Sequence, residues 1–278
     1  LSDIVKTGRT HLMDAMPVTF GQELRAWANQ IKAARGQFEE TLPKIEQLAI
    51  GGTAVGTGVN AHPDLSQKVV ALLKQKTGIE FQSAPDLFKA ISSQDVALEL
   101  SSNTRNLAVS LTKISNDLRW MNSGPLAGLA EISLPMLQPG SSIMPGKVNP
   151  TQCEAMTMVC AQVVGNDAAV TIGGMSGHFE LNVFKPVMIF NILMSARLIG
   201  DVCVSFNDNC AKGIEPNHEA IKENLQNSLM LVTALNTHIG YEKAAEIAKL
   251  AYKNGTTLKE EALGLGYVSE EEFDKWVD

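Results

Sequence analysis

A chain of 278 residues, of which 45% are hydrophobic and 19% charged, has the composition of a globular protein with a substantial core, in one large domain or two smaller ones. The formal net charge of −7 argues against nucleic acid or an anionic membrane as partner, and it means that an anionic substrate must be held by local cations. Aromatic residues make up only 5%, so the core must consist of aliphatic side chains and methionine, which favours helices over a β-sandwich.

Two long helices are predicted in the first half of the chain. Apolar residues recur at steps of three and four over residues 20–49, which indicates one helix with a single buried stripe, and Pro43 marks the place for a kink. A second stripe runs from Leu100 to Met121, in a helix expected to start near Ser93. A helix of about 30 residues spans roughly 45 Å. Because that is too long to bury against a compact single-chain core, we expect these helices to pack against other long helices, from the same chain or a partner.

The rest of the chain is also predicted to be helical. Residues 153–172 are apolar almost all round, as expected for a helix at the centre of a bundle, and a further helix is expected over residues 187–204. Short helices separated by glycine and polar breaks are expected at 217–228, 241–253, 257–264 and 269–277. No convincing strand alternation is visible. The sequence therefore predicts an all-α fold, with a central long-helix bundle domain over residues 1–215 and a small helical C-terminal domain over residues 216–278.

Neither a metal site nor a membrane span is expected. The cysteines at 153, 160, 203 and 210 form two pairs seven residues apart, so each pair shares a helix face without zinc-ligand spacing, and we expect reduced, buried thiols. The histidines other than His11 form no metal-ligand pattern. Residues 155–172 come nearest to a membrane span, but Gln162, Asn166 and Asp167 interrupt them. We expect a soluble protein without a signal peptide, in the cytoplasm, or in the mitochondrial matrix if the source is eukaryotic.

Residues 134–150, LPMLQPGSSIMPGKVNP, have an unusual composition. Four of the chain's eleven prolines lie in this segment, glycines accompany its serines and its lysine, and it precedes the apolar helix. This composition is typical of an active-site lid, and its two hydroxyls, one ammonium and one amide could bind a carboxylate and supply a base. The alternative is an ordinary surface connection in which Asn149 caps the helix that starts at Pro150.

A second polar segment, residues 6–23, places Thr10 and His11 between Arg9 and Asp14, just ahead of the first long helix. Histidine is the usual proton-transfer residue near neutral pH. A lone histidine near a helix is more often structural, so the spacing alone leaves both interpretations open.

The glycine-rich run GGTAVGTG at 51–58 could be mistaken for a phosphate-binding loop. Such loops need a strand before them, whereas this run follows a predicted helix. We therefore expect it to end the helix and to allow close backbone packing.

Three of these segments resemble signature segments of the fumarase/aspartase superfamily. GSSIMPGKVNP at 140–150 matches at eleven contiguous positions, and GRTH at 8–11 and GGTAVGTG at 51–58 stand in the same order with similar spacing. The resemblance extends through SLMLVTALNTHIG at 228–240. It implies a helical bundle assembled as a homotetramer. It also implies that the chain is the larger, C-terminal part of a member, without the N-terminal third whose polar segments bind substrate carboxylates.

The residues around the lysine resemble the fumarase branch of this superfamily. PGK at 145–147 followed by TQCEA at 151–155 is the fumarase form, whereas aspartate ammonia-lyases typically read PAKVNP. The implied reaction is the reversible hydration of fumarate to L-malate, an anti addition through an aci-carboxylate intermediate. It uses a small dicarboxylate as substrate and no cofactor. An aspartate ammonia-lyase of the same superfamily and an inactive helical assembly fragment remain as alternatives.

The resemblance assigns roles to individual residues. Ser141 matches the base that removes the C3 proton of malate, His11 matches the residue that transfers a proton through water, and Glu154 matches the carboxylate that partners this histidine. The matches to substrate-binding residues are Thr10, Ser142, Lys147 and Asn149. Lys147 and the loop amides would stabilise the additional negative charge of the intermediate. The resemblance further implies composite sites, with His11 and Ser141 from different subunits, while Met13 and Met16 depart from the family pattern.

Overall fold

The computed structural model describes residues 1–138, 140 and 143–277. By their internal contacts the residues fall into two units. Unit 1 contains Leu1–Ala26, Met121–Ser133 and Glu215–Asp278, and unit 2 contains Trp27–Trp120 and Leu134–Ile214. Unit 1 is therefore discontinuous in the sequence.

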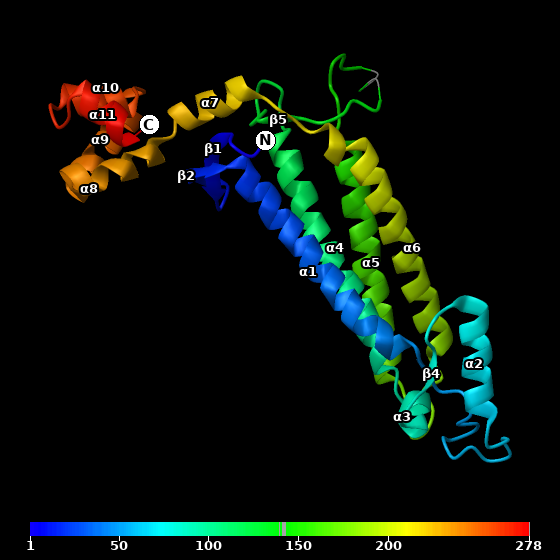
Figure 1. The fold of residues 1–278 in the computed structure, drawn as a ribbon. Coiled ribbons are helices and arrows are strands. Elements are labelled where there is room, and N and C mark those ends of the chain that lie inside the picture. The colour runs from blue at the N-terminus through cyan, green and yellow to red at the C-terminus, as the bar shows by residue number, and fades with distance from the viewer. Residues whose placement is uncertain (139, 141–142, 278) are drawn as a thin grey trace. The chain divides into compact units, whose positions relative to one another are not determined.

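Helices dominate the described residues, and the strands other than β1 and β2 are two residues long (Figure 1). The predicted helical fold class is confirmed. In chain order the elements are β1 (Val5–Thr10), β2 (Met13–Thr19), α1 (Phe20–Ile45), β3 (Gln47–Leu48), α2 (Leu65–Thr77), β4 (Gln82–Ser83), α3 (Leu87–Ser92), α4 (Asp95–Met121), β5 (Ile132–Ser133), α5 (Thr151–Met175), α6 (Lys185–Asn209), η1 (Ala211–Gly213), β6 (Glu215–Pro216), α7 (His218–Gln226), η2 (Leu229–Leu235), α8 (Asn236–Ile239), α9 (Tyr241–Asn254), α10 (Leu258–Gly264) and α11 (Glu270–Val277).

The predicted long helices correspond to α1 and α4. Helix α1 starts at Phe20 as expected but ends at Ile45, four residues earlier than predicted, with Pro43 in its last turn. Proline has no N–H and its ring crowds the preceding turn, so it is tolerated near an end more readily than in a helix interior. Leu42, a member of the predicted stripe, is 53% exposed. Leu42 therefore interrupts the stripe beside the proline, whereas Ile45 beyond it is again half-buried.

Polar side chains connect successive long helices within unit 2. Between α1 and α4, Asn103 donates to Thr41 at 2.8 Å. Between α4 and α5, Ser101 donates to Asp167 at 2.7 Å, and between α5 and α6, Asn166 donates to Ser195 at 3.0 Å. These groups are buried, so each hydrogen bond offsets the free-energy cost of removing polar atoms from water. Each bond also specifies which faces of the two helices pack together. A cluster of Val170, Met188 and Ile192 packs beside them.

Helix α5 differs from the expectation that it would be buried on all sides. One face is buried, but Met158, Ile172 and Met175 are 66%, 58% and 77% exposed in the single chain. On α6, Phe190 and Leu193 are likewise 59% and 61% exposed. Apolar faces of this size on long helices are characteristic of surfaces that pack against another chain.

By length and composition, Thr151–Met175 and Lys185–Gly213 would each suffice to cross a bilayer. The central helices of a soluble bundle satisfy the same test. The bond between Asn166 and Ser195 joins the two helices through polar groups, which is the arrangement expected inside a bundle.

The prediction that strands are absent is wrong for the first 19 residues. Strands β1 and β2 form an antiparallel hairpin, in which Ala15 and Met16 together oppose Gly8. The hairpin was missed because its most buried side chains include Lys6 and Thr7, which break the apolar alternation of an ordinary half-buried strand.

The four short helices predicted after residue 216 are confirmed as α7, α9, α10 and α11, whereas η2 and α8 were not predicted. The core shared by η2, α9, α10 and α11 includes Leu235, Ile247 and Phe273. Residues from Glu215 onward group with the chain's first 26 residues, and Ile132 pairs with Pro216. The division into domains at residue 215 stays a prediction, because grouping by contacts does not show which segment folds by itself.

The glycine-rich run packs closely, as predicted, but the prediction that it ends the preceding helix is wrong, since α1 already ends at Ile45. Gly56 has a φ of 105°, and a Cβ there would lie 2.9 Å from the Cα of Phe88. Helix α2 begins only at Leu65, seven residues after Gly58, so the run does not open a helix as a phosphate-binding loop does.

Candidate active site

Thr10 and His11 lie at the tip of the β1–β2 hairpin in unit 1, with exposed side chains. Thr10 pairs with Met13, so His11 and Leu12 alone form the connection, with φ values of 56° and 61°. A two-residue connection of this kind needs positive φ at both positions, which Asn and Gly adopt most easily. Left-handed backbone costs other residues about 1–2 kcal/mol each. His11 is therefore held in a strained, outward position, as often occurs at functional sites.

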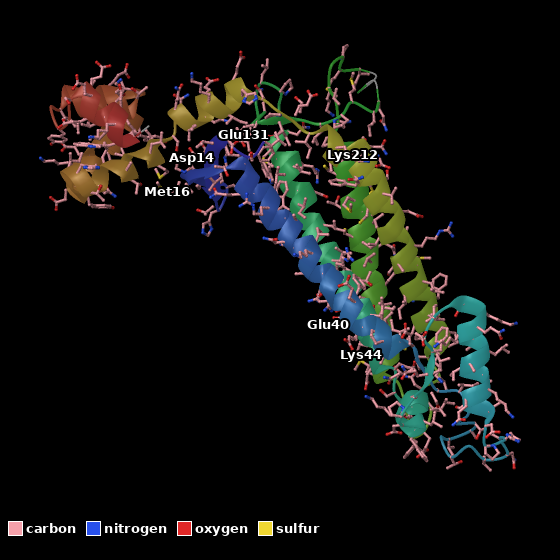
Figure 2. The ribbon with its side chains drawn as sticks, viewed as in Figure 1. Asp14, Met16, Glu40, Lys44, Glu131 and Lys212 are labelled. Carbon is pink, nitrogen blue, oxygen red and sulfur yellow. The ribbon has the colours of Figure 1, made fainter. Side chains whose placement is uncertain are left out.

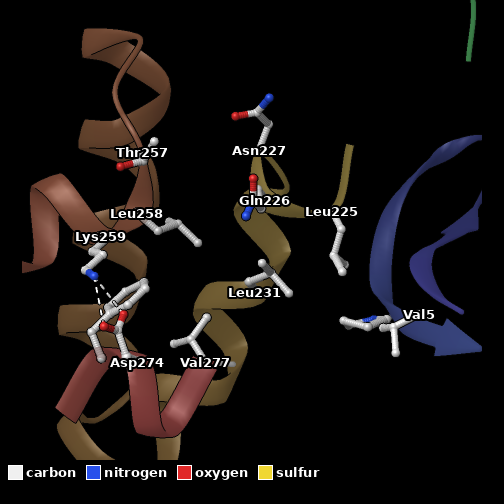
Figure 3. A pocket seen from close by; sticks show the side chains of 12 residues that line it. Val5, Leu225, Gln226, Asn227, Leu231, Thr257, Leu258, Lys259, Asp274 and Val277 are labelled. Carbon is white, nitrogen blue, oxygen red and sulfur yellow. Dashed lines mark hydrogen bonds and ion pairs between the residues drawn. The ribbon is translucent and has the colours of Figure 1, made fainter. Parts of the chain in front are cut away.

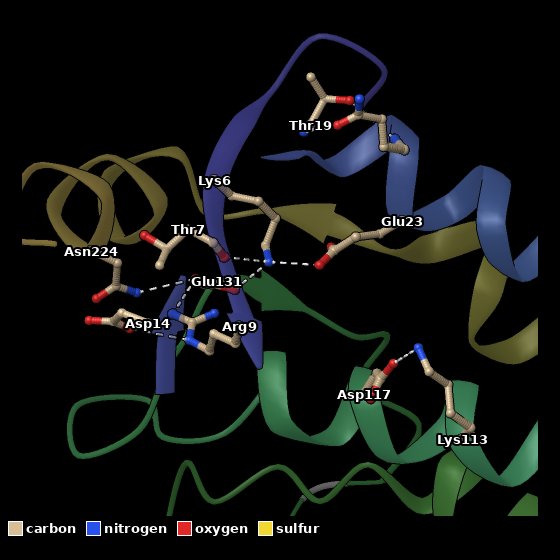
Figure 4. A network of polar contacts seen from close by, with 11 residues as sticks. Lys6, Thr7, Arg9, Asp14, Thr19, Glu23, Lys113, Asp117, Glu131 and Asn224 are labelled. Atoms are coloured by element: carbon tan, nitrogen blue, oxygen red, sulfur yellow. Dashed lines mark hydrogen bonds and ion pairs between the residues drawn. The ribbon is translucent and has the colours of Figure 1, made fainter. Parts of the chain in front are cut away.

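A buried charge network runs along strand β1 of the same hairpin (Figure 4). The carboxylate of Glu131 is fully buried, and Arg9 donates to it at 2.8 Å. The ammonium of Lys6, itself 3% exposed, lies 3.3 Å from Glu131 and 3.1 Å from Glu23. Asn224 donates to the backbone oxygen of Leu129 at 3.3 Å. The network ties β1 to the segment after α4 and to α7.

Lys6 and Arg9 are three residues apart and would point to opposite faces of a regular strand. Both nevertheless reach Glu131. The bulge of β2 opposite Gly8 increases the local twist of the hairpin, and with two long side chains this lets both cations meet one carboxylate. The approach of the strands is tight, because a Cβ on Gly8 would lie 2.4 Å from the Met16 carbonyl oxygen.

Sequence reasoning did not single out Glu131. A weak signal was present, since a lone carboxylate stands within the apolar run LAEISLP at 129–135. A buried acid needs cationic partners. Nothing in the sequence indicates that those partners lie more than 120 residues earlier.

Lys147 and Asn149 lie in the loop that precedes α5, in unit 2, and both are exposed. The loop folds back on itself, because a Cβ on Gly140 would lie 2.4 Å from the carbonyl oxygen of Lys147. At its start Pro135 packs against Gly213. The predicted base Ser141 and the predicted substrate contact Ser142 lie outside the described residues.

Glu154 lies in the first turn of α5, where its charge is favoured by the positive end of the helix. The alternative role for Asn149 as helix cap is wrong, because the capping residue is Pro150 and no side chain caps the helix. Thr10 and His11 belong to unit 1, whereas Lys147, Asn149 and Glu154 belong to unit 2. The pairing of His11 with Glu154 therefore stays a prediction.

The thiol next to Glu154 is not a candidate nucleophile. Cys153 is fully buried, with its Sγ 3.9 Å from that of Cys210. The hydrogen bond with Cys210 and then burial raise the pKa of Cys153 well above its usual range. A thiol that stays protonated is unreactive.

A cavity of about 660 Å³ in unit 1 contains none of the predicted site residues (Figure 3). Its lining includes Val5, Leu231 and Phe273, and its one lysine, Lys259, is paired with Asp274 at 2.8 Å and Glu270 at 2.9 Å. A cation already paired twice is poorly suited to hold an anionic substrate. Within the described part of the chain, no group of three His, Cys, Asp or Glu side chains is placed to hold a metal ion.

Two protein-family models match the chain. A family model described as "Lyase" matches residues 1–165, and one described as "Fumarase C C-terminus" matches residues 231–278. The first match includes the hairpin, the glycine-rich run and the loop before α5. The chain belongs to this lyase family.

Two relatives named fumarate hydratase are more than half identical to this chain. "Fumarate hydratase class II" of Haemophilus influenzae is 58% identical over 275 residues, which is 99% of this chain and 59% of that protein. "Fumarate hydratase, mitochondrial" of Homo sapiens is 56% identical over 276 residues, 99% of this chain and 54% of that protein. The chain thus spans less than two thirds of the length of these relatives.

Solved structures show the same fold. A recombinant class II fumarase from Schistosoma mansoni superposes with a TM-score of 0.95 at 39% identity, over 99% of this chain and 60% of that one. A structure titled fumarate lyase:delta crystallin from Brucella melitensis gives a TM-score of 0.94 at 41% identity, over 100% and 60%. The fold is that of the fumarase/aspartase superfamily, as the sequence predicted.

Proposed function

We propose that the protein of which this chain forms all or part catalyses the reversible hydration of fumarate to L-malate. The observation that carries this proposal is the 58% identity, along 99% of the chain, to a relative named class II fumarate hydratase. The reaction is an anti addition and elimination through an aci-carboxylate intermediate. Its substrate class is a small dicarboxylate.

Each site residue has a role in this proposal. In the direction of dehydration, Ser141 removes the C3 proton of malate, which places additional negative charge on the neighbouring carboxylate. Lys147 and the backbone amides of its loop stabilise that charge, and Asn149, Ser142 and Thr10 hold the substrate. His11, partnered by Glu154, protonates the departing hydroxyl through a water molecule. Lys147 and Asn149 are exposed in the loop and Thr10 at the hairpin tip, so all three are accessible to a small solute.

We further propose a homotetramer with composite sites. The exposed apolar faces of α5 and α6 support assembly, since Met175 and Phe190 are 77% and 59% exposed in the single chain. Separation of the site residues into two units is compatible with a site completed by other subunits. Cytoplasm or mitochondrial matrix is the proposed location, and the human relative is named as mitochondrial.

The test is turnover by the purified protein from the complete gene, with fumarate and with L-aspartate as separate substrates. We expect hydration of fumarate and no measurable ammonia release from aspartate. Gly146 and the TQC run at 151–153 weigh against the ammonia-lyase alternative. Ammonia release without fumarate hydration would replace the proposal by that alternative. Inactivity of a correctly assembled protein on both substrates would favour a purely structural role.

A further inference from the structure

The hairpin that carries Thr10 and His11 has a well-defined anchor immediately before its tip. Arg9 directly precedes Thr10, and its guanidinium donates to the Glu131 carboxylate at 2.8 Å (Figure 4). The side chain of Arg9 is 15% exposed and that of Glu131 is fully buried. A charge-assisted bond in such surroundings is stronger and more directional than one in water.

Glu131 is itself fixed by its backbone. Its N–H donates to the carbonyl of Met121, the last residue of α4, at 2.8 Å. Its carbonyl accepts from the N–H of Asn217, which caps α7, at 2.9 Å. The backbone of Glu131 is therefore bonded to the end of α4 and the start of α7, so its carboxylate projects from a fixed point and a group bonded to that carboxylate has a defined position.

We propose that Glu131 is a positioning residue, which through Arg9 sets the place and direction of the hairpin tip and so of His11 and Thr10. The inference rests on the proposed function, in which these two side chains meet the substrate. A two-stranded hairpin is marginally stable by itself, and the left-handed backbone at His11 and Leu12 adds strain, so the tip needs support from its base.

Stability alone does not account for a buried carboxylate here. Replacing a buried ion pair by packed apolar side chains often leaves a protein equally stable or makes it more so. The ion pair between Arg9 and Glu131 instead fixes the direction in which the hairpin tip points. A reacting group displaced by about 1 Å can lose on the order of 10²-fold in rate, so a fixed direction matters most beside a catalytic histidine.

The first experiment measures the hairpin directly in the protein from the complete gene. Amide hydrogen exchange is followed for peptides covering residues 9–14 in wild type, Glu131→Gln and Glu23→Gln. The control removes a carboxylate from the same network but leaves the Arg9–Glu131 bond in place. We expect exchange in this segment to rise about tenfold in Glu131→Gln and to change less than about twofold in Glu23→Gln. Unchanged exchange in a folded Glu131→Gln protein would overturn the inference, whatever reaction the enzyme catalyses.

The second experiment asks whether Glu131 acts through His11. With fumarate as substrate, Glu131→Gln should lower kcat about 10²-fold in the wild-type background. In a His11→Asn background the same substitution should lower the residual kcat by no more than about twofold, because the positioned proton-transfer residue is gone. Displacement of Thr10, which holds the substrate, should raise KM in both backgrounds. Equal losses in both backgrounds would show a general structural role and overturn the inference. Absence of fumarate hydration in wild type would instead reject the proposed function and leave the exchange experiment to decide.

If Glu131→Gln does not fold, Arg9→Met takes its place in the exchange experiment. It removes the hairpin's side of the bond while Glu131 keeps its ion pair with Lys6 at 3.3 Å. The same rise in exchange over residues 10–14 is expected. Wild-type exchange rates in Arg9→Met would contradict the anchor.

Discussion

His11 illustrates at the scale of one residue how the site differs from its surroundings. Its backbone adopts a conformation that favours Asn or Gly, its side chain is exposed, and its strand is held by charges buried a few residues earlier. A histidine with a structural role is more often packed and hydrogen-bonded within the protein. The local geometry therefore favours the functional interpretation that the sequence left open.

Ser141→Ala is expected to reduce fumarate turnover by about three orders of magnitude or more, because it removes the proposed proton-accepting group. Circular dichroism and the oligomeric state should match wild type, since the substitution removes a single hydroxyl oxygen. A variant that keeps most of the activity would contradict the assignment of Ser141 as base.

At the scale of elements, the hairpin's close strand contact leads to a prediction about Gly8. Gly8→Ala places a Cβ 2.4 Å from the Met16 carbonyl oxygen, so backbone must shift, and we expect destabilisation of about 1–3 kcal/mol. Gly36→Ala is the matched control, because Gly36 lies within α1 and a Cβ there meets no atom within 4 Å. It should stabilise by about 0.5–1 kcal/mol. Thermal unfolding of both variants measures the difference in stability between them. Equal changes in the free energy of unfolding would contradict the prediction for Gly8.

A second element-scale prediction concerns Glu99 of α4, which is bonded to Thr41 and Lys44 near the end of α1. Figure 2 labels Lys44 at that end of α1. Hydrogen bonds from Lys44 at 2.6 Å and Thr41 at 3.0 Å hold the pKa of Glu99 below its usual value. A lowered folded-state pKa adds stability above the unfolded pKa, about 4.3, and that stability is lost as the pH falls through the folded value.

Glu99→Gln should therefore lower Tm at pH 7, and the difference from wild type should shrink as the pH falls below about 4. Glu39→Gln is the control, since Glu39 pairs with Arg35 on the exposed face of one helix, where such pairs contribute little. A difference for Glu99→Gln that is independent of pH would contradict the role of its charge.

The sequence was most informative for long helices and least for the hairpin. Periodicity identified α1 and α4 because their burial is one-sided along many turns. It misjudged α5, whose apolar surface extends over a face left exposed in the single chain. Periodicity missed β1 and β2, because the buried side chains of β1 include a charged residue and do not follow the apolar alternation of a half-buried strand. The candidate site residues were predicted from the family resemblance. The contact between Arg9 and Glu131 could not be predicted from the sequence, because it is visible only when the two residues are placed in space.

At the scale of the whole molecule, composite sites would make activity depend on which subunits assemble together. His11→Asn and Ser141→Ala should each be nearly inactive as homotetramers of the protein from the complete gene. After equal amounts are unfolded together and refolded, subunits associate at random. About a quarter of the sites should then combine an intact histidine with an intact serine from another chain, since closed symmetry makes all sites equivalent.

Recovered activity near that fraction of wild type would support the composite site. The mixture is first shown by mass spectrometry to contain mixed tetramers, and each variant refolded alone is the control. Mixed tetramers without activity would place both residues in the site of a single chain.

The discontinuity of unit 1 has a consequence for how the protein is made. Its hairpin is bonded to Glu131, which follows Arg9 by 122 residues. Strand β5 likewise cannot pair until β6 has been synthesised, since Ile132 pairs with Pro216. A ribosome adds about 5–20 residues per second, so β1 and β2 leave the exit tunnel several seconds before their partners exist. Contacts so distant in sequence also close slowly. The hairpin residues, Thr10 and His11 among them, are thus synthesised well before their partners and reach their native structure only after them, and during that interval they are exposed to proteases and chaperones.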